Sequence, residues 1–100
     1  MAQYDVYDLP NEQGMLFVDL QSGAVDEFNT RLLAPLVPAV ESLKPIRRVN
    51  HALTFSSRTY LFMPQLMSAV RTKELGQPLG NIADQRDRIV SALDIVFVGI

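Results

Sequence analysis

The residue types that most often carry catalysis are sparse in this 100-residue chain. His51 is its one histidine, and we expect it to lie half-buried on a strand with a satisfied hydrogen bond, with a catalytic role as the alternative. Asp19 falls on the polar face of a predicted strand, which favours a solvated or backbone-bonding carboxylate over a general base. Phosphate-binding loops, dinucleotide glycine patterns and metal-binding helix motifs are absent from the sequence. We therefore predict no catalytic residue, no cofactor and no metal site.

Two further pairs of residues have ordinary structural interpretations. Arg47 and Arg48 form a short basic pair in a predicted loop, which is typical of a solvated surface and is equally compatible with an acidic partner. Met63 and Met67 lie four residues apart and are more often flexible core filler than a binding face.

Composition and charge exclude several classes of protein. The apolar fraction of 48% is too high for a disordered chain. The lack of cysteine excludes a disulfide-stapled fold and a cysteine-based zinc site. A net charge of −2 argues against nucleic-acid binding through bulk charge. No basic-then-apolar leader opens the chain and no uncharged run reaches the roughly 20 residues of a membrane span, so we expect one cytoplasmic domain over residues 1–100 with no membrane partner.

The first three quarters of the chain predict short strands separated by proline, glycine and small polar residues. Pro35 lies inside one of them and marks an edge or a bulge, because proline cannot donate a ladder hydrogen bond. The predicted strands begin around Tyr4 and Val6 and continue at Met15–Gln21, Arg31–Val37, Val49–Phe55, Thr59–Met63 and Val70–Leu75. The predicted turns and loops are Pro10–Gly14, Ser22–Phe28, Ser56–Arg58, Gly76–Gly80, and Ala39–Lys44 with one helical turn.

The last fifth of the chain, Asn81 to Ile100, has helical periodicity instead. Asn81 can cap the first turn, and Asp84 and Arg88 are spaced for a side-chain pair. The predicted buried stripe consists of Ile82, Ile89, Leu93, Val96 and Ile100. Strands followed by one helix predict an α+β, mostly β domain: a curled antiparallel sheet with a C-terminal α-helix packed on it.

The opposite face of this helix and its apolar end are the two features that suggest a partner. Asp87, Ser91, Asp94 and Val98 recur at three- and four-residue spacing and form the exposed face, which on composition alone is also compatible with a solvated helix surface. The segment Val96–Ile100 is strongly apolar, so it is either docked into the core or presented to a partner.

Three segments of the sequence resemble the CcdB toxin family. The segment Leu16–Ser22, followed by Asp26 and Asn29–Leu36, is similar to the N-terminal signature of that family. The ending Ala92–Ile100 resembles its C-terminal helix, which closes in Gly-Ile, and Phe62–Val70 is similar to its methionine-rich segment. The resemblance extends over most of the chain at matching distances.

The resemblance implies a small SH3-like sheet that forms a symmetric homodimer without catalytic activity. A CcdB toxin belongs to a type II toxin–antitoxin system that maintains plasmids. It binds the GyrA subunit of DNA gyrase and traps the enzyme on cleaved DNA. A CcdA-like antitoxin neutralises it, and together the two proteins bind operator DNA and repress their own operon.

The family's gyrase-facing residues lie on the last helix, at its end, and in the loop after the second strand. By resemblance, the gyrase-binding residues here are Ala24, Val25, Asp26, Asp87, Ser91, Asp94, Val98, Gly99 and Ile100. A well-known member has tryptophan at the position of Val98, where the paired indoles sandwich a gyrase arginine. Valine has no π face, so a cation–π contribution of about 0.5–2 kcal/mol is absent.

Two alternatives to a gyrase inhibitor stay open at the level of sequence. One is an mRNA-cleaving toxin of the MazF/Kid type, which needs a basic groove with a positioned acid and base; the net charge and single histidine argue against it. The other is a non-toxic chromosomal relative that binds only an antitoxin, which Val98 favours.

Overall fold

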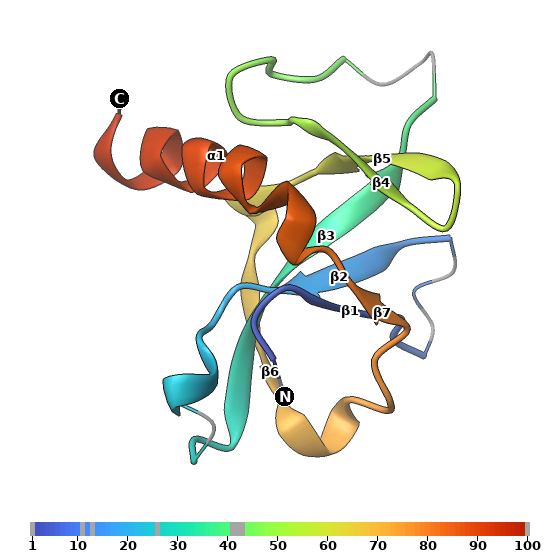
Figure 1. Ribbon diagram of the computed structural model, residues 1–100, viewed down its shortest axis with the longest axis vertical. Helices are drawn as coiled ribbons and strands as arrows, with labels where there is room; N and C mark the ends of the chain where they lie inside the picture. The colour runs from blue at the N-terminus through green and yellow to red at the C-terminus, as the bar shows by residue number, and fades with distance from the viewer. Residues whose placement is uncertain (1, 11, 13, 26, 41–43, 100) are drawn as a thin grey trace.

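A curled antiparallel sheet carries one C-terminal helix, α1 (Arg86–Val98), on one of its faces in the computed structural model, which describes residues 2–10, 12, 14–25, 27–40 and 44–99 (Figure 1). The predicted fold class is therefore confirmed. The strands are β1 (Asp5–Tyr7), β2 (Leu16–Asp19), β3 (Thr30–Pro38), β4 (Ala52–Phe55), β5 (Arg58–Phe62), β6 (Ser68–Arg71) and β7 (Gly80–Asn81). Short 3₁₀ turns connect them: η1 (Gly23–Val25), η2 (Pro64–Leu66), η3 (Thr72–Glu74) and η4 (Ala83–Gln85).

Strand β3 is the centre of the sheet, whose order is β4-β5-β3-β2-β1-β7. One side of β3 pairs with β2, and the other pairs first with β6 and then with β5. Pro35 lies between the last β6 pair, at Leu33, and the first β5 pair, at Leu36. Its carbonyl accepts from the Met63 amide at 2.9 Å, so its nitrogen faces the place where one neighbour gives way to the other. The prediction of an edge strand is wrong, because this junction accommodates a missing amide in a central strand.

The sheet is buried on both faces, which the alternating pattern of β2 did not predict. Val18 faces the main core, which includes Ile89 and Ala92 of α1, whereas Phe17 faces a second, smaller core on the other side. The main core also contains Tyr4, Val6, Leu20, Ala34, Leu36, Leu53, Tyr60, Phe62 and Ile82, and the second core contains Tyr7 and Leu33.

The local turn chemistry mostly follows the sequence. Ser56 and Ser57 both have positive φ, as a two-residue hairpin between β4 and β5 requires, so this predicted turn is confirmed. The predicted strand at 70–75 lies two to four residues earlier, in β6, and β7 begins at Gly80, the last residue of the predicted loop 76–80. Residues 41–43 of the predicted loop with a helical turn lie outside the described residues.

The two end strands of the sheet approach each other, which closes the curl. A Cβ atom placed on Gly80 of β7 would lie 2.7 Å from Cε1 of Phe55 in β4, so the phenyl ring packs directly on the glycine backbone. Only a residue without a side chain permits this approach. The close contact accounts for Gly80, which the sequence predicts in a loop, lying in the edge strand β7.

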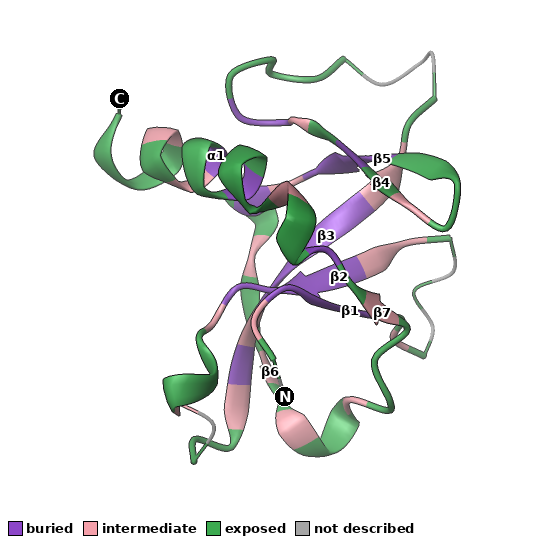
Figure 2. Ribbon diagram, viewed as in Figure 1, coloured by how far each residue is buried: buried purple, intermediate pink, exposed green. Residues whose placement is uncertain are grey.

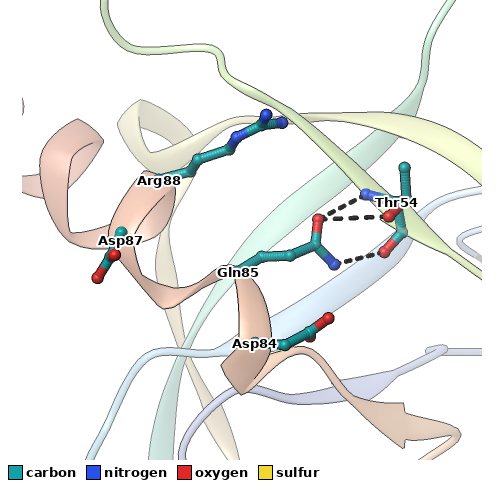
Figure 3. A pocket seen from close by; sticks show the side chains of 5 residues that line it. All are labelled: Thr54, Asp84, Gln85, Asp87 and Arg88. Atoms are coloured by element: carbon teal, nitrogen blue, oxygen red, sulfur yellow. Dashed lines mark hydrogen bonds between the residues drawn. The ribbon is translucent and has the colours of Figure 1, made fainter.

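Side chains from η4 and α1 bond the outer edge of β4 (Figure 3). Gln85 accepts from the Thr54 amide at 2.8 Å and donates to the Thr54 carbonyl at 2.7 Å, as a neighbouring strand would. Arg88 donates to the Ala52 carbonyl at 2.8 Å. The predicted Asp84–Arg88 pair is not formed, because the guanidinium reaches the strand instead. These bonds block the exposed strand edge and hold the start of the helix against the sheet.

We predict that Gln85→Ala lowers the free energy of unfolding by about 1–2 kcal/mol, because the amide and the carbonyl of Thr54 in β4 then bond water instead of the Gln85 side chain. Urea unfolding monitored by circular dichroism measures the loss. Gln77→Ala is the matched control, since Gln77 is exposed on a loop away from β4. Equal stability of both variants would show that the side-chain bonds contribute nothing to the placement of the helix.

Candidate interaction surface

The outer face of α1 is exposed where the sequence predicts it. Asp87, Ser91, Asp94 and Val98 are all exposed, so this part of the prediction is confirmed. Asn81 accepts from the Ala83 amide at 2.8 Å, at the start of η4, the 3₁₀ turn that precedes the helix. The N-cap position of α1 itself is Gln85, so Asn81 does not cap the helix as predicted.

The predicted buried stripe holds for only the first part of α1. Ile82 and Ile89 are buried and Leu93 packs half-buried against the core, but Val96 is 37% exposed and Ala92 takes a buried place instead. The helical period is correct, yet the last turns of α1 extend past the sheet and find nothing beneath them (Figures 1 and 2). The stripe ends because the sheet ends, which periodicity alone cannot reveal.

The C-terminal end of the helix presents apolar side chains to solvent. Phe97 is 67% exposed and Val98 is 66% exposed, so these residues are not docked into the core of this chain. Gly99 ends the helix in the left-handed conformation, with φ of +82°, and its amide bonds the carbonyls of Asp94 and Ile95 at 3.0 and 3.1 Å. Glycine adopts this cap without strain. Ile100 lies outside the described residues.

The loop after β2 forms a second, separate candidate patch. Its turn η1 is closed by hydrogen bonds from the Ala24 amide to the Ser22 hydroxyl at 3.1 Å and from the Val25 amide to the Ser22 carbonyl at 3.2 Å. Ala24 is exposed, Val25 is half-buried, and Asp26 lies outside the described residues. Figure 1 shows η1 and the end of α1 at opposite ends of the long axis, so a single chain does not bring the two patches together.

A buried ion pair anchors the base of this loop. Arg31 Nε donates to Asp19 Oδ2 at 2.8 Å, and both side chains are 0% exposed. The same guanidinium donates to the carbonyls of Gln21 and Ser22, and Asp19 Oδ1 accepts from the Gln21 amide at 2.9 Å. Gln21 in turn accepts from the Leu32 amide at 3.0 Å. Gln21 and Ser22, the two residues that lead into η1, are therefore held in place by these hydrogen bonds.

This network corrects the expectation for Asp19. The carboxylate bonds the backbone, as predicted, but it does not lie on a polar face, because the second core covers that face of the sheet. Arg31 is the residue that the sequence reasoning missed. Its signal is the register of β2 and β3, which pairs Asp19 with Leu33 and so places Arg31 on the same face, two residues away.

The other chemistry-bearing residues have structural environments. His51 is half-buried, and its Nε2 lies 3.1 Å from the Arg48 carbonyl, so that nitrogen carries the proton; the predicted satisfied histidine is confirmed. Arg47 and Arg48 are exposed, as predicted, and Met67 packs against the main core. Within the described ranges, His, Cys, Asp and Glu side chains form no group of three that could hold a metal ion.

The structure defines a small curled β domain with one C-terminal helix whose apolar end is exposed, and comparison with known proteins identifies the family. The family model described as CcdB protein matches residues 3–99, so the chain belongs to the CcdB family. A solved structure described as an endoribonuclease in complex with its cognate antitoxin, from a mycobacterial species, is similar with a TM-score of 0.74. It is 16% identical, with 94% of this chain and 91% of that chain covered, which establishes a shared fold. Family and fold support a toxin of a toxin–antitoxin system.

Among the residues with a described structure, every helix is too short or too polar to cross a bilayer.

We predict that Asp19→Asn lowers the free energy of unfolding by about 3–5 kcal/mol, because the buried guanidinium of Arg31 loses the charged partner that bonds its Nε at 2.8 Å. Chemical unfolding of the purified protein measures this change. Asp8→Asn is the control, since Asp8 is exposed, and a change within about 0.5 kcal/mol is expected for it. If both variants lost equally little free energy of unfolding, the result would show that the ion pair does not stabilise the fold.

Proposed function

We propose that this protein is a toxin that binds the GyrA subunit of DNA gyrase, traps the enzyme on cleaved DNA and is neutralised by a CcdA-like antitoxin. The observation that carries the proposal is the C-terminal part of α1, where exposed Phe97 and Val98 adjoin the polar residues Ser91 and Asp94. An apolar centre beside polar groups is the usual anatomy of a protein–protein interface. The loop residues Ala24 and Val25 would supply a second contact.

Binding without catalysis is the mode of action that the side chains favour. His51 donates its Nε2 proton to a backbone carbonyl, and Asp19 is buried against Arg31. Asp19 is therefore out of reach of a substrate in solvent, and one of the two ring nitrogens of His51 is engaged by the backbone. The proposed toxin therefore acts as a wedge against its target and needs no cofactor.

A symmetric homodimer is part of the proposal. Phe97 and Val98 are exposed, and a two-fold axis near the end of α1 would present this apolar end of both copies to one target. Because the net charge is −2, operator DNA is expected to be bound only together with the antitoxin, in the cytoplasm.

Two other functions have a specific observation in their favour. The fold shared with an endoribonuclease favours an mRNA-cleaving toxin of the MazF/Kid type. Val98, in place of an aromatic residue, favours a chromosomal relative that binds only an antitoxin.

One assay with two substrates separates the three functions. Purified protein is incubated with gyrase and supercoiled plasmid, and in parallel with a structured RNA. We predict linear plasmid after denaturation and intact RNA. A chain that ends after Phe97 is expected to lose plasmid linearisation, whereas His51→Ala retains it, because the target contacts α1 rather than a catalytic group.

The alternatives give different results in the same assay. Cleaved RNA that disappears with His51→Ala would contradict the proposal and favour the ribonuclease. If the wild type neither linearises plasmid nor cleaves RNA, although circular dichroism shows a folded protein, the antitoxin-binding relative would be favoured.

We further predict that Val98→Trp binds a GyrA dimerisation fragment more tightly, by roughly tenfold if both copies in the dimer gain a cation–π contact. The helix tolerates the change because Val98 is exposed. Calorimetric titration at fixed salt measures both affinities, with Val90→Trp as the matched control on an exposed position earlier in α1. Equal affinity of Val98→Trp and wild type would show that no gyrase arginine faces this position.

A further inference from the structure

A short segment at the start of β1, residues 2–5, bonds two parts of the chain that carry different candidate surfaces. We call it the N-terminal bridge. On one side, the Tyr4 amide donates to the Asp19 carbonyl at the end of β2 at 2.7 Å. On the other side, the Tyr4 carbonyl accepts from the Ile82 amide, just before η4, at 3.0 Å. A single residue therefore connects the strand that leads into η1 with the turn that leads into α1.

Side-chain hydrogen bonds strengthen the N-terminal bridge on both sides. Gln3 Nε2 donates to the Leu20 carbonyl at 3.0 Å. Asn81 Nδ2 donates to the Gln3 carbonyl and to Asp5 Oδ1, both at 2.9 Å. The other carboxylate oxygen of Asp5 accepts from the Ala2 amide at 3.0 Å, which closes the segment into a turn. The bridge is therefore bonded to β2, to β7 and to itself.

The backbone of Tyr4 is strained. Its φ of +70° lies in the left-handed region, which an aromatic residue rarely adopts. Its side chain is buried in the main core together with Leu20 and Ile82. A residue keeps such a conformation only when the contacts around it impose it. The bonds to Asp19 and Ile82 impose it from opposite sides, so the loss of either one allows Tyr4 to relax and to disturb the other.

The residues at the two ends of the bridge also hold the turns that follow them. Asp19 bonds the bridge with its carbonyl, and with its carboxylate it bonds Arg31 and the Gln21 amide at the base of η1. Asn81 bonds the bridge with its amide nitrogen, and its oxygen accepts from the Ala83 amide at the start of η4. A continuous series of hydrogen bonds thus extends from η1 through the bridge to η4.

We propose that the N-terminal bridge couples the loop that carries η1 to the start of α1, so that opening of one promotes opening of the other. Tyr4 is the two-state element: it is strained and bonded on both sides, or relaxed and released. Such coupling is reciprocal by thermodynamic linkage. It is a property of the free chain, and it holds whether or not the protein acts on gyrase.

The test measures amide hydrogen exchange in the isotope-labelled full chain by nuclear magnetic resonance, first in Asn81→Asp. Aspartate keeps an oxygen for the Ala83 amide but lacks the two donors to the bridge. We expect the amides of Gln21, Ala24 and Val25 to exchange about tenfold faster, because the bridge no longer holds Tyr4 in its strained state.

The matched control is Gln85→Glu, which makes the same change of charge in η4 and removes a donor to Thr54 instead of the bridge. The η1 amides should stay within about twofold of the wild type. Unchanged rates around η1 in Asn81→Asp, or equal acceleration by both variants, would overturn the proposal. Acceleration shared equally by the amides of β3 and β5 would show a general loss of stability and would overturn it too.

Gln3→Glu tests the coupling from the other end and does not depend on the folding of the first variant. Glutamate lacks the donor to the Leu20 carbonyl, so the bridge is weakened on its β2 side. We expect the amides of Ala83 and Gln85 in η4 to exchange about threefold or more faster. Asn29→Asp, exposed on the loop after η1, is the control with the same change of charge. Unchanged rates in η4 with Gln3→Glu would contradict reciprocity and overturn the proposal.

Discussion

The hydrogen bonds between the start of α1 and the outer edge of β4 decide where the candidate surface on α1 lies. Gln85 pairs with both backbone groups of Thr54, and Arg88 bonds the next free carbonyl along the strand, at Ala52. Ile89 and Ala92 then reach the main core, so the helix is fixed at its beginning by polar contacts and along its first half by apolar ones. The second half of α1 has no part of the sheet beneath it and projects into solvent (Figure 1).

This arrangement separates structural and interacting residues along one helix. The same contacts that hold α1 also fix Arg88 beside β4, while the free end presents Phe97 and Val98. The strand edge that Gln85 and Arg88 cover is one that would otherwise be open to pairing with another chain. One short segment thus protects the sheet and orients the free end of α1.

The loop after β2 depends on a different constraint, the buried pair of Arg31 and Asp19. A buried ion pair is stabilised only when its remaining hydrogen-bonding groups are satisfied. Here the backbone of Gln21 and Ser22 supplies those partners, so the loop and the ion pair hold each other in position. The proposed contact at Ala24 and Val25 lies in the turn η1 of this loop.

Much of the fold follows from local patterns in the sequence. The helical period after Asn81, the two-serine hairpin and the alternation in β2 and β3 are all short-range signals, and the structure contains those elements. These local patterns cannot predict features that depend on contacts between residues distant in the sequence. Pro35 is acceptable in a central strand only because β6 gives way to β5 there, and Gly80 becomes a strand only because Phe55 packs on it.

The candidate site shows the same division. Exposure of Asp87, Ser91, Asp94 and Val98 follows from helical geometry, and the sequence predicts it. Burial of Asp19 depends on a second core on the far face of the sheet, and exposure of Val96 depends on where the sheet ends. The approach of α1 to the segment before β4, which lies some forty residues earlier in the sequence, brings Arg88 close to Arg47 and His51. Local sequence patterns cannot predict this approach.

Hydrogen–deuterium exchange of the protein, alone and with a GyrA dimerisation fragment, tests the central claim most directly. If the free end of α1 is the target-binding surface, exchange slows in the last turns of α1 and around η1. The amides of β4, β5 and β6 should keep the same rates, since the sheet serves only to position the helix. Slower exchange confined to those strands, with α1 unchanged, would contradict the account and place the binding surface on the sheet.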